Sequence, residues 1–504
     1  MTTLAMPSTA RLTLPRWLPL ACIFVLAVFL RHVLVANTDV SWDLTVADKF
    51  LDGQRLYVDI IEVNPPATVF LYVVPALLGR LSGAPAEFFV DVLVFLAAGF
   101  SLWLSGRILR KNGLAESADG WLLATVAAAA LMVLPAQTFG EREHIGLIAF
   151  LPLLAVCAAR AKGNTPDLAS VIVAGVCGGI TVIIKPHFAA AIVCTSAAAA
   201  LYARSWRPVF ALENWIAAAL LAGYVVFVVT AFPQFVHDVL PMVMTVYVPV
   251  KANFLKLIIH FATPLWVAAL LLIALLKRGA MFKFPFGLLL AASVGFSISY
   301  YVQQKGWSYH SYPMLALALI ALALAFFDRW HREPSDSRTD RPKRLASAFV
   351  AALIAGTTFC WMNFAVDCSA LAAPIRAIKP HPKILALSAD LAVGHPLTRQ
   401  VEGTWVSRVS ALWITAGVML RRKYETLDPQ TNARLEGYAT RDRTMLAQDI
   451  ARHRPDVILV DRILKGIDWL AWANSYPALA EQMRPYREDR TIGGVLILRR
   501  ETGR

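Results

Sequence analysis

Long apolar runs recur through the first 364 residues of the chain, and they constrain its fold more than any other feature. Each run is about 17 to 25 residues long, which is the length that an α-helix needs to cross a bilayer. Of the 504 residues, 58% are hydrophobic and only 16% are charged. The sequence therefore predicts an α-helical polytopic membrane protein. The clear spans are 17–37, 88–106, 120–138, 144–159, 168–184, 188–203, 211–231, 259–276, 284–302, 310–327 and 345–364.

One further apolar run, 66–81, decides the topology. If it crossed the membrane, every later loop would invert, and basic residues such as Arg107, Arg160 and Arg204 would face outward, against the positive-inside rule. The run is also short and contains Pro75, so we expect a helix that lies in the outer interface. About 11 transmembrane helices remain, with the N-terminus in the cytoplasm and the C-terminus outside.

The positive charge of the chain follows the same topology. The net charge of +14 is spread over short loops rather than gathered in one stripe, which argues for the lipid bilayer and against nucleic acid as a partner. The loop 328–344 is charged and has no periodicity, and we assign it no chemistry. The cysteines lie in or beside apolar spans without the spacing of a disulfide framework or a zinc site.

From about residue 365 the composition turns polar. The segments KILALS, DVILVD and GGVLILRR have the short apolar runs of buried strands, and TMLAQDIARHRP between them is typical of a helix. The sequence therefore predicts two parts, a transmembrane module over 1–364 and a small soluble α/β domain over 365–504 outside the membrane.

Five connecting segments should open on the outer side under this topology: 37–66, 138–144, 185–188, 232–258 and 303–313. The first of them is acidic although the chain as a whole is basic, and it contains Asp39, Asp43 and Glu62. Asp39 and Asp43 are four residues apart, so on a helical turn they would share one face. Glu62 stands before a stiff step that ends in two prolines, which fixes where its carboxylate emerges.

The second segment carries four consecutive ionisable residues between two apolar spans. Ionisable groups at such a depth are costly and are functional candidates, although a helix end exposed to water would also explain them. These residues are Glu141, Arg142, Glu143 and His144.

The remaining candidates are basic or aromatic. Lys185 and His187 follow an apolar span, where an ammonium suits an anionic phosphate, although a snorkelling lysine is an equal alternative. A further cluster on the same side mixes a cation with rings that would stack on a sugar or, alternatively, anchor in the head groups. It consists of Lys305, Trp307, Tyr309 and His310.

The outer acidic loop with its DxxxD pattern and KFLDGQRLY, the interfacial helix after it and a second acidic turn resemble the GT-C class of polyprenyl-phosphate-sugar-dependent glycosyltransferases. That class includes protein mannosyltransferases, aminoarabinose transferases and rhizobial lipopolysaccharide transferases. The resemblance covers about the first 330 residues.

The resemblance also implies roles for particular residues. Asp39, or alternatively Asp43, would be the general base, and Glu143, with Glu141 as its rival, would be the acidic residue of the second loop. Lys185 would lie near the lipid phosphate. The usual residue at the second acidic position is aspartate, so the glutamate here departs from the pattern.

We therefore expect a bacterial inner-membrane glycosyltransferase that transfers a hexose or pentose from a polyprenyl-phosphate donor, with inversion, to a periplasmic acceptor. The acceptor would be a glycolipid, a polysaccharide or a protein. No spacing of ligands requires a metal ion, although Asp39 and Glu143 could share a divalent cation. The alternatives are a transporter or lipid flippase, whose carboxylates should lie within spans, and an assembly factor without catalysis.

Overall fold

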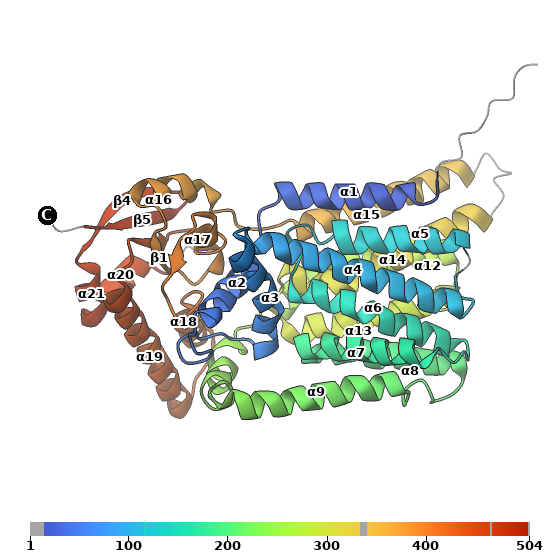
Figure 1. Ribbon diagram of the computed structural model, residues 1–504, viewed down its shortest axis with the longest axis horizontal. Helices are drawn as coiled ribbons and strands as arrows, with labels where there is room; N and C mark the ends of the chain where they lie inside the picture. The colour runs from blue at the N-terminus through green and yellow to red at the C-terminus, as the bar shows by residue number, and fades with distance from the viewer. Residues whose placement is uncertain (1–14, 116, 333–339, 464–465, 502–504) are drawn as a thin grey trace, which may run out of the picture.

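The computed structural model of the protein describes residues 15–115, 117–332, 340–463 and 466–501. Figure 1 shows a bundle of long, roughly parallel helices at one end and a small α/β domain at the other. The N-terminal segment 1–14 and residues 333–339 of the predicted connector 328–344 lie outside the described residues.

Every predicted span is a helix, which confirms the polytopic helical fold. Among the described residues, seven helices are long and apolar enough to cross a membrane, or eight if the bent pair α1 and α2 forms one span. The described residues also form six shorter apolar helices, of which three, α5 with its continuation η1, α7 and α12, correspond to predicted spans. The helices are α1 (Leu18–Val33), α4 (Ala86–Lys111), α5 (Ser117–Ala128), η1 (Ala129–Val133), α6 (Arg142–Ala161), α7 (Leu168–Ile184), α8 (Ala189–Ala203), α9 (Leu212–Ala231), α12 (Ala262–Lys277), α13 (Phe286–Gln303), α14 (Ser308–Arg332) and α15 (Asp340–Met362).

Contacts join the basic loops at one end of the bundle. Lys111 lies 3.4 Å from Asp167, and the Asn164 side chain donates to the Asn112 carbonyl at 2.8 Å. Helices α2 and α3 lie at the other end, beside the C-terminal domain (Figure 1). The basic loops therefore lie at the end opposite to α2 and α3, as the positive-inside rule requires. Which of the two ends faces the cytoplasm stays a prediction.

The first acidic segment is not the loop that its composition predicts, because half of it is a helix. Helix α2 (Thr38–Leu51) bends away from α1 by 71°. The Asn37 side chain caps it and accepts hydrogen bonds from the amides of Asp39 at 2.7 Å and Val40 at 3.3 Å. Helix α3 (Pro66–Ser82) follows and packs against α2.

Helix α2 is buried on two sides. Leu44 belongs to the apolar core of the helical bundle, whereas Trp42 and Val46 belong to a second core shared with the C-terminal domain. This double burial explains why an acidic segment forms a stable helix, since tertiary packing supplies most helical stability in proteins.

The C-terminal domain contains a five-stranded mixed sheet in the order β2-β1-β3-β5-β4. Strands β1, β2 and β3 are parallel to one another, while β5 runs antiparallel to β3 and to β4. The three predicted strands are β1, β3 and β5, so that part of the prediction is confirmed. The elements are α16 (Ala372–Ile378), β1 (Lys383–Leu387), α17 (Leu397–Gln400), β2 (Thr404–Trp405), α18 (Trp413–Tyr424), α19 (Pro429–His453), β3 (Val457–Asp461), α20 (Trp469–Asn474), α21 (Pro477–Met483), β4 (Tyr486–Ile492) and β5 (Val495–Arg500).

Polar contacts fasten this domain to α2. The Lys49 ammonium donates to the Ser407 carbonyl at 2.6 Å. Arg399 contacts both Asp48 of α2 and Glu87 of α4, each with a nitrogen–oxygen distance of 2.6 Å. The domain therefore holds the helix that bears the acidic side chains.

Replacing Arg399 with glutamine should loosen this attachment. Hydrogen bonds to charged groups each contribute about 1.5–3 kcal/mol, so amide exchange in α2 should accelerate by about tenfold or more. Hydrogen–deuterium exchange with mass spectrometry measures this. The control is Arg422→Gln, which removes an ion pair to Glu436 within the domain. Equal amide exchange in α2 for both variants would show that Arg399 does not attach the C-terminal domain to α2.

Candidate functional site

A cavity of about 1230 Å³ lies where the helical bundle meets the C-terminal domain. All five segments predicted to open on one side contribute side chains to it. Of the thirteen candidate residues from the sequence, ten line the cavity. They are Asp39, Asp43, Glu62, Arg142, Lys185, His187, Lys305, Trp307, Tyr309 and His310.

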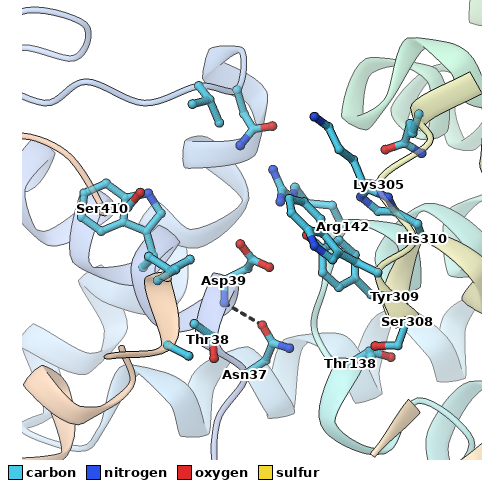
Figure 2. Close-up of a pocket in the computed structure, with 18 of the residues that line it drawn as sticks. Asn37, Thr38, Asp39, Thr138, Arg142, Lys305, Ser308, Tyr309, His310 and Ser410 are labelled. Atoms are coloured by element: carbon cyan, nitrogen blue, oxygen red, sulfur yellow. Dashed lines mark hydrogen bonds between the residues drawn. The ribbon is translucent and has the colours of Figure 1, made fainter. Parts of the chain in front are cut away.

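The first turns of α2 form the acidic wall. The Asp39 carboxylate points into the cavity from the beginning of the helix (Figure 2). Asp43 lies one turn further and is only 1% exposed, and its Oδ2 has no hydrogen-bond partner among the described residues. The wall therefore presents one accessible carboxylate with a second one buried behind it.

Glu62 lines the cavity but is already fully engaged. The Trp42 indole donates to its Oε2 at 2.5 Å, and Asn64 donates to its Oε1 through the backbone amide at 3.0 Å and the side-chain amide at 2.6 Å. This carboxylate fixes α2 against the segment that follows it.

The basic wall begins with Arg142, the first residue of α6. Figure 2 shows its side chain across the cavity from Asp39, beside Tyr309 and His310. Arg142 is 5% exposed, and its Nε and Nη1 have no hydrogen-bond partner within the described part of the chain. A buried guanidinium with free donors on a cavity surface is suited to bind an anion.

Glu143 lies behind this wall rather than on it. It is fully buried and pairs with the Lys185 ammonium, which also donates to the Gln303 side chain at 3.3 Å. His310 Nε2 is 3.3 Å from the same glutamate oxygen. Glu143 therefore holds Lys185 and His310 in place beside the cavity.

Lys305 lies in the turn between α13 and α14. Its ammonium donates to the carbonyls of Tyr247 at 2.7 Å and Val250 at 2.6 Å. Burial, together with the neighbouring charge of Lys251, lowers the pKa of Lys305 to about 8. Lys251 is itself exposed and lines the cavity, although no pattern in the sequence selected it.

Besides Glu143, two predicted site residues do not line the cavity. His144 accepts a hydrogen bond from the Gly140 amide at 3.0 Å and donates to the Leu131 carbonyl at 2.7 Å, so its ring organises the core. Glu141 is completely buried, and burial, together with the nearby Asp39, raises its pKa well above the usual range. The protonated form of Glu141 is therefore favoured.

The C-terminal domain supplies a third wall that sequence reasoning missed. Asp390, Ser410 and Trp413 line the cavity. Asp390 follows the carboxyl end of β1, which is where ligands of parallel sheets commonly bind. Its position just after a predicted strand is the signal in the sequence that could have identified it. Burial raises the pKa of Asp390.

No obvious metal centre accompanies these walls. Within the described ranges, no group of three or more histidine, cysteine, aspartate or glutamate side chains is arranged to hold a metal ion. The chemistry available to the cavity is that of a carboxylate facing several cations.

Comparison with known proteins identifies the fold. No protein-family model and no curated protein matches the sequence. Among solved structures, ArnT from Cupriavidus metallidurans, bound to undecaprenyl phosphate, matches with a TM-score of 0.55 and 13% sequence identity. The match covers 95% of this chain and 97% of ArnT, and so includes both the bundle and the C-terminal domain. The chain therefore has the fold of ArnT, which confirms the GT-C fold that the resemblance predicted.

Proposed function

We propose that the protein is a glycosyltransferase of the bacterial inner membrane that uses a polyprenyl-phosphate-linked sugar as its donor. The observation that carries this proposal is the position of the Asp39 carboxylate opposite Arg142 in one cavity (Figure 2). A base on one side and cations on the other are what displacement of a sugar from a phosphate requires. The likeness to ArnT supports a lipid-linked donor.

The reaction would be a single displacement. Asp39 takes the proton from an acceptor hydroxyl while the hydroxyl oxygen attacks the anomeric carbon. The bond between that carbon and the phosphate oxygen breaks, and the phosphate keeps the electron pair. Arg142 and Lys185 stabilise the charge that develops there. Because attack and departure take place on opposite faces of the sugar, the configuration inverts.

The acceptor would approach from the wall that carries Asp39 and the C-terminal domain. Asp390 and Ser410 offer hydrogen-bonding groups there, and Trp413 offers an aromatic surface. Such groups suit a hydroxyl-bearing acceptor on the periplasmic side, whether glycolipid, polysaccharide or protein. The N-terminus would then lie in the cytoplasm.

A deletion strain tests the function directly. We expect the lipid-linked sugar to accumulate and one surface glycan to lose that sugar, and purified protein in nanodiscs should transfer the labelled sugar from the lipid donor. If the purified protein instead moves the intact lipid across a bilayer without transferring its sugar, the protein is a flippase.

The pH dependence of donor binding should show the contribution of the Lys305 cation. Its ammonium is lost as the pH rises through about 8, so the donor KM should rise above that pH, by up to about tenfold per pH unit. Lys305→Arg should keep the KM low at higher pH, since arginine stays charged. The measurement is kcat/KM between pH 6.5 and 9.5.

The control for Lys305→Arg is Lys256→Arg, at an exposed position that does not line the cavity. Unfolding at high pH does not explain the expected rise in the donor KM. The folded state disfavours the Lys305 cation, so this group makes folding more favourable as the pH rises from about 8 toward 10.5. Identical pH profiles for wild type and Lys305→Arg would remove Lys305 from the donor site.

A further inference from the structure

Two loops of the C-terminal domain form one side of the functional cavity. The first follows β1 and carries Asp390, and the second carries Ser410 and leads into α18, which begins at Trp413. The Leu412 amide donates to the Ser388 carbonyl at 2.7 Å, so the two loops are joined. Their side chains therefore form one surface at the carboxyl end of β1, where ligands of parallel sheets commonly bind.

This surface is held by contacts within the protein. The Arg408 side chain donates to Asp449 at 2.8 Å, and the Arg408 carbonyl accepts from the Ile61 amide at 2.8 Å. Asp390 Oδ1 accepts from the Ala392 amide at 2.9 Å. A ligand that binds here therefore spends little free energy on ordering the protein.

The surface lies beside the proposed base. The short helix η7 (Leu391–Val393), which directly follows Asp390, packs against α2. Figure 2 shows Ser410 on the side of the cavity that bears Asp39, with Arg142 across from both. A molecule bound to this surface thus brings its hydroxyl groups toward Asp39 and leaves the basic wall free for the phosphate of the donor.

Trp413 gives the surface an aromatic face. Its ring is half-buried and meets the Tyr247 ring edge to face, with 6.1 Å between the centroids and 87° between the planes. The Lys305 ammonium lies 3.9 Å from the centroid of the same Tyr247 ring and fixes its position. A sugar ring presents apolar C–H groups on its face and hydroxyl groups around its rim. An aromatic face with a carboxylate and a hydroxyl beside it matches both.

A peptide acceptor finds no comparable match. Extended peptides commonly bind by adding a strand to an exposed sheet edge. None of the described residues that line the cavity belongs to a strand, since the C-terminal domain turns its loops toward the cavity rather than a sheet edge. The chemistry of this wall therefore favours a carbohydrate over a polypeptide.

We propose that Trp413, Asp390 and Ser410 bind a sugar ring of the acceptor, so that the acceptor is a glycan rather than a peptide. The inference rests on the proposed function, because it names the acceptor class of the same cavity. The sugar ring stacks on Trp413, while Asp390 Oδ2 and Ser410 Oγ form hydrogen bonds with its hydroxyl groups. The cavity of about 1230 Å³ exceeds the range of about 300–1,000 Å³ that is usual for one small ligand, so it holds the acceptor ring beside the donor sugar.

The variant Trp413→Ala tests the stacking. With oligosaccharides released from the surface glycans of the deletion strain as acceptors, we expect the acceptor KM to rise about tenfold, because the sugar loses its apolar partner. The donor KM and the slow transfer of the donor sugar to water should not change, because neither involves the acceptor. Trp413→Phe, which keeps an aromatic face, should recover most of the loss.

The matched control is Tyr424→Ala, at the other end of the same helix. Tyr424 is 72% exposed and does not line the cavity, so this variant should keep the wild-type acceptor KM. An equal rise in the acceptor KM for Tyr424→Ala and Trp413→Ala would show a general effect on α18 and would overturn the stacking assignment.

A binding measurement gives a second readout that needs no sugar transfer. Saturation-transfer difference NMR with the same oligosaccharides should show transfer to the C–H protons of one sugar ring in the wild type and its loss in Trp413→Ala. If this pattern appears in a protein that transfers no sugar, the acceptor subsite stands and the proposed function fails.

Two other results would overturn the proposal. Transfer of the sugar to a polypeptide that carries no glycan, or an unchanged acceptor KM in Trp413→Ala, would show that no acceptor sugar stacks here. Should Trp413→Ala not fold, Ser410→Ala decides. The Ser410 side chain makes no hydrogen bond within the described part of the chain, so its loss leaves no protein group unpaired. The acceptor KM of Ser410→Ala should rise about fivefold, and an unchanged value would remove the subsite.

Discussion

Replacing Asp39 with asparagine is expected to lower kcat for sugar transfer about 10³-fold, the contribution typical of a general base. Asparagine has almost the same shape but cannot accept the acceptor's proton. The helix should persist, because its N-terminus is capped by the Asn37 side chain and not by Asp39. Transfer of labelled sugar from a lipid-linked donor in nanodiscs measures the loss.

Two further variants make that result specific. Asp238→Asn changes an exposed aspartate outside the cavity and should retain full activity. Asp43→Asn distinguishes Asp43 from Asp39, since Asp43 is nearly fully buried whereas Asp39 reaches the cavity. Loss of activity only in Asp43→Asn would make Asp43 the base. Full activity in both variants would remove the displacement mechanism.

The sequence predicted the membrane helices well because each is a local pattern. A run of apolar residues with the right length needs no knowledge of its neighbours. The continuous apolar strands β1, β3 and β5 were found for the same reason. Strand β4 (Tyr486–Ile492) was missed because it is mostly polar and exposed, and β2 has only two residues.

Elements stabilised by distant contacts were harder to predict. The acidic composition of α2 indicates a loop, and only its packing between two cores makes it a helix. Asp390 and Ser410 come beside Asp39 because the C-terminal domain docks through contacts such as Lys49 with Ser407, which lie 358 positions apart. No local pattern contains that information.

The convergence of the five connecting segments was predictable from topology alone, because segments on one side of a bundle share one end. The role of each side chain within that end was not. His144 and Glu143 are neighbours in a run of four ionisable residues, yet one organises the core and the other holds Lys185. Their difference follows from the direction of each side chain on the first turn of α6.

Lys185→Met is expected to have the largest combined effect on stability and activity. Lys185 and Glu143 form a buried pair whose side chains are only 10% and 0% exposed. Removing one partner of a buried pair leaves an uncompensated charge, which destabilises a protein by about 3–5 kcal/mol. The variant should therefore melt at a lower temperature in detergent and also lose sugar transfer.

The double variant Lys185→Met/Glu143→Gln separates these two effects. Without the glutamate charge, most of the lost stability should return, because no ion remains unpaired. Transfer should stay low, because the cation beside the departing phosphate is still missing. The comparison pair is Arg160 and Glu213, with exposures of 21% and 0%, at the end of the bundle away from the cavity. Breaking that pair should lower the melting temperature yet leave kcat/KM per folded molecule unchanged. If the Lys185→Met/Glu143→Gln variant regained transfer together with stability, the lysine would serve only to neutralise its partner, and Arg142 would remain as the principal cation for the phosphate.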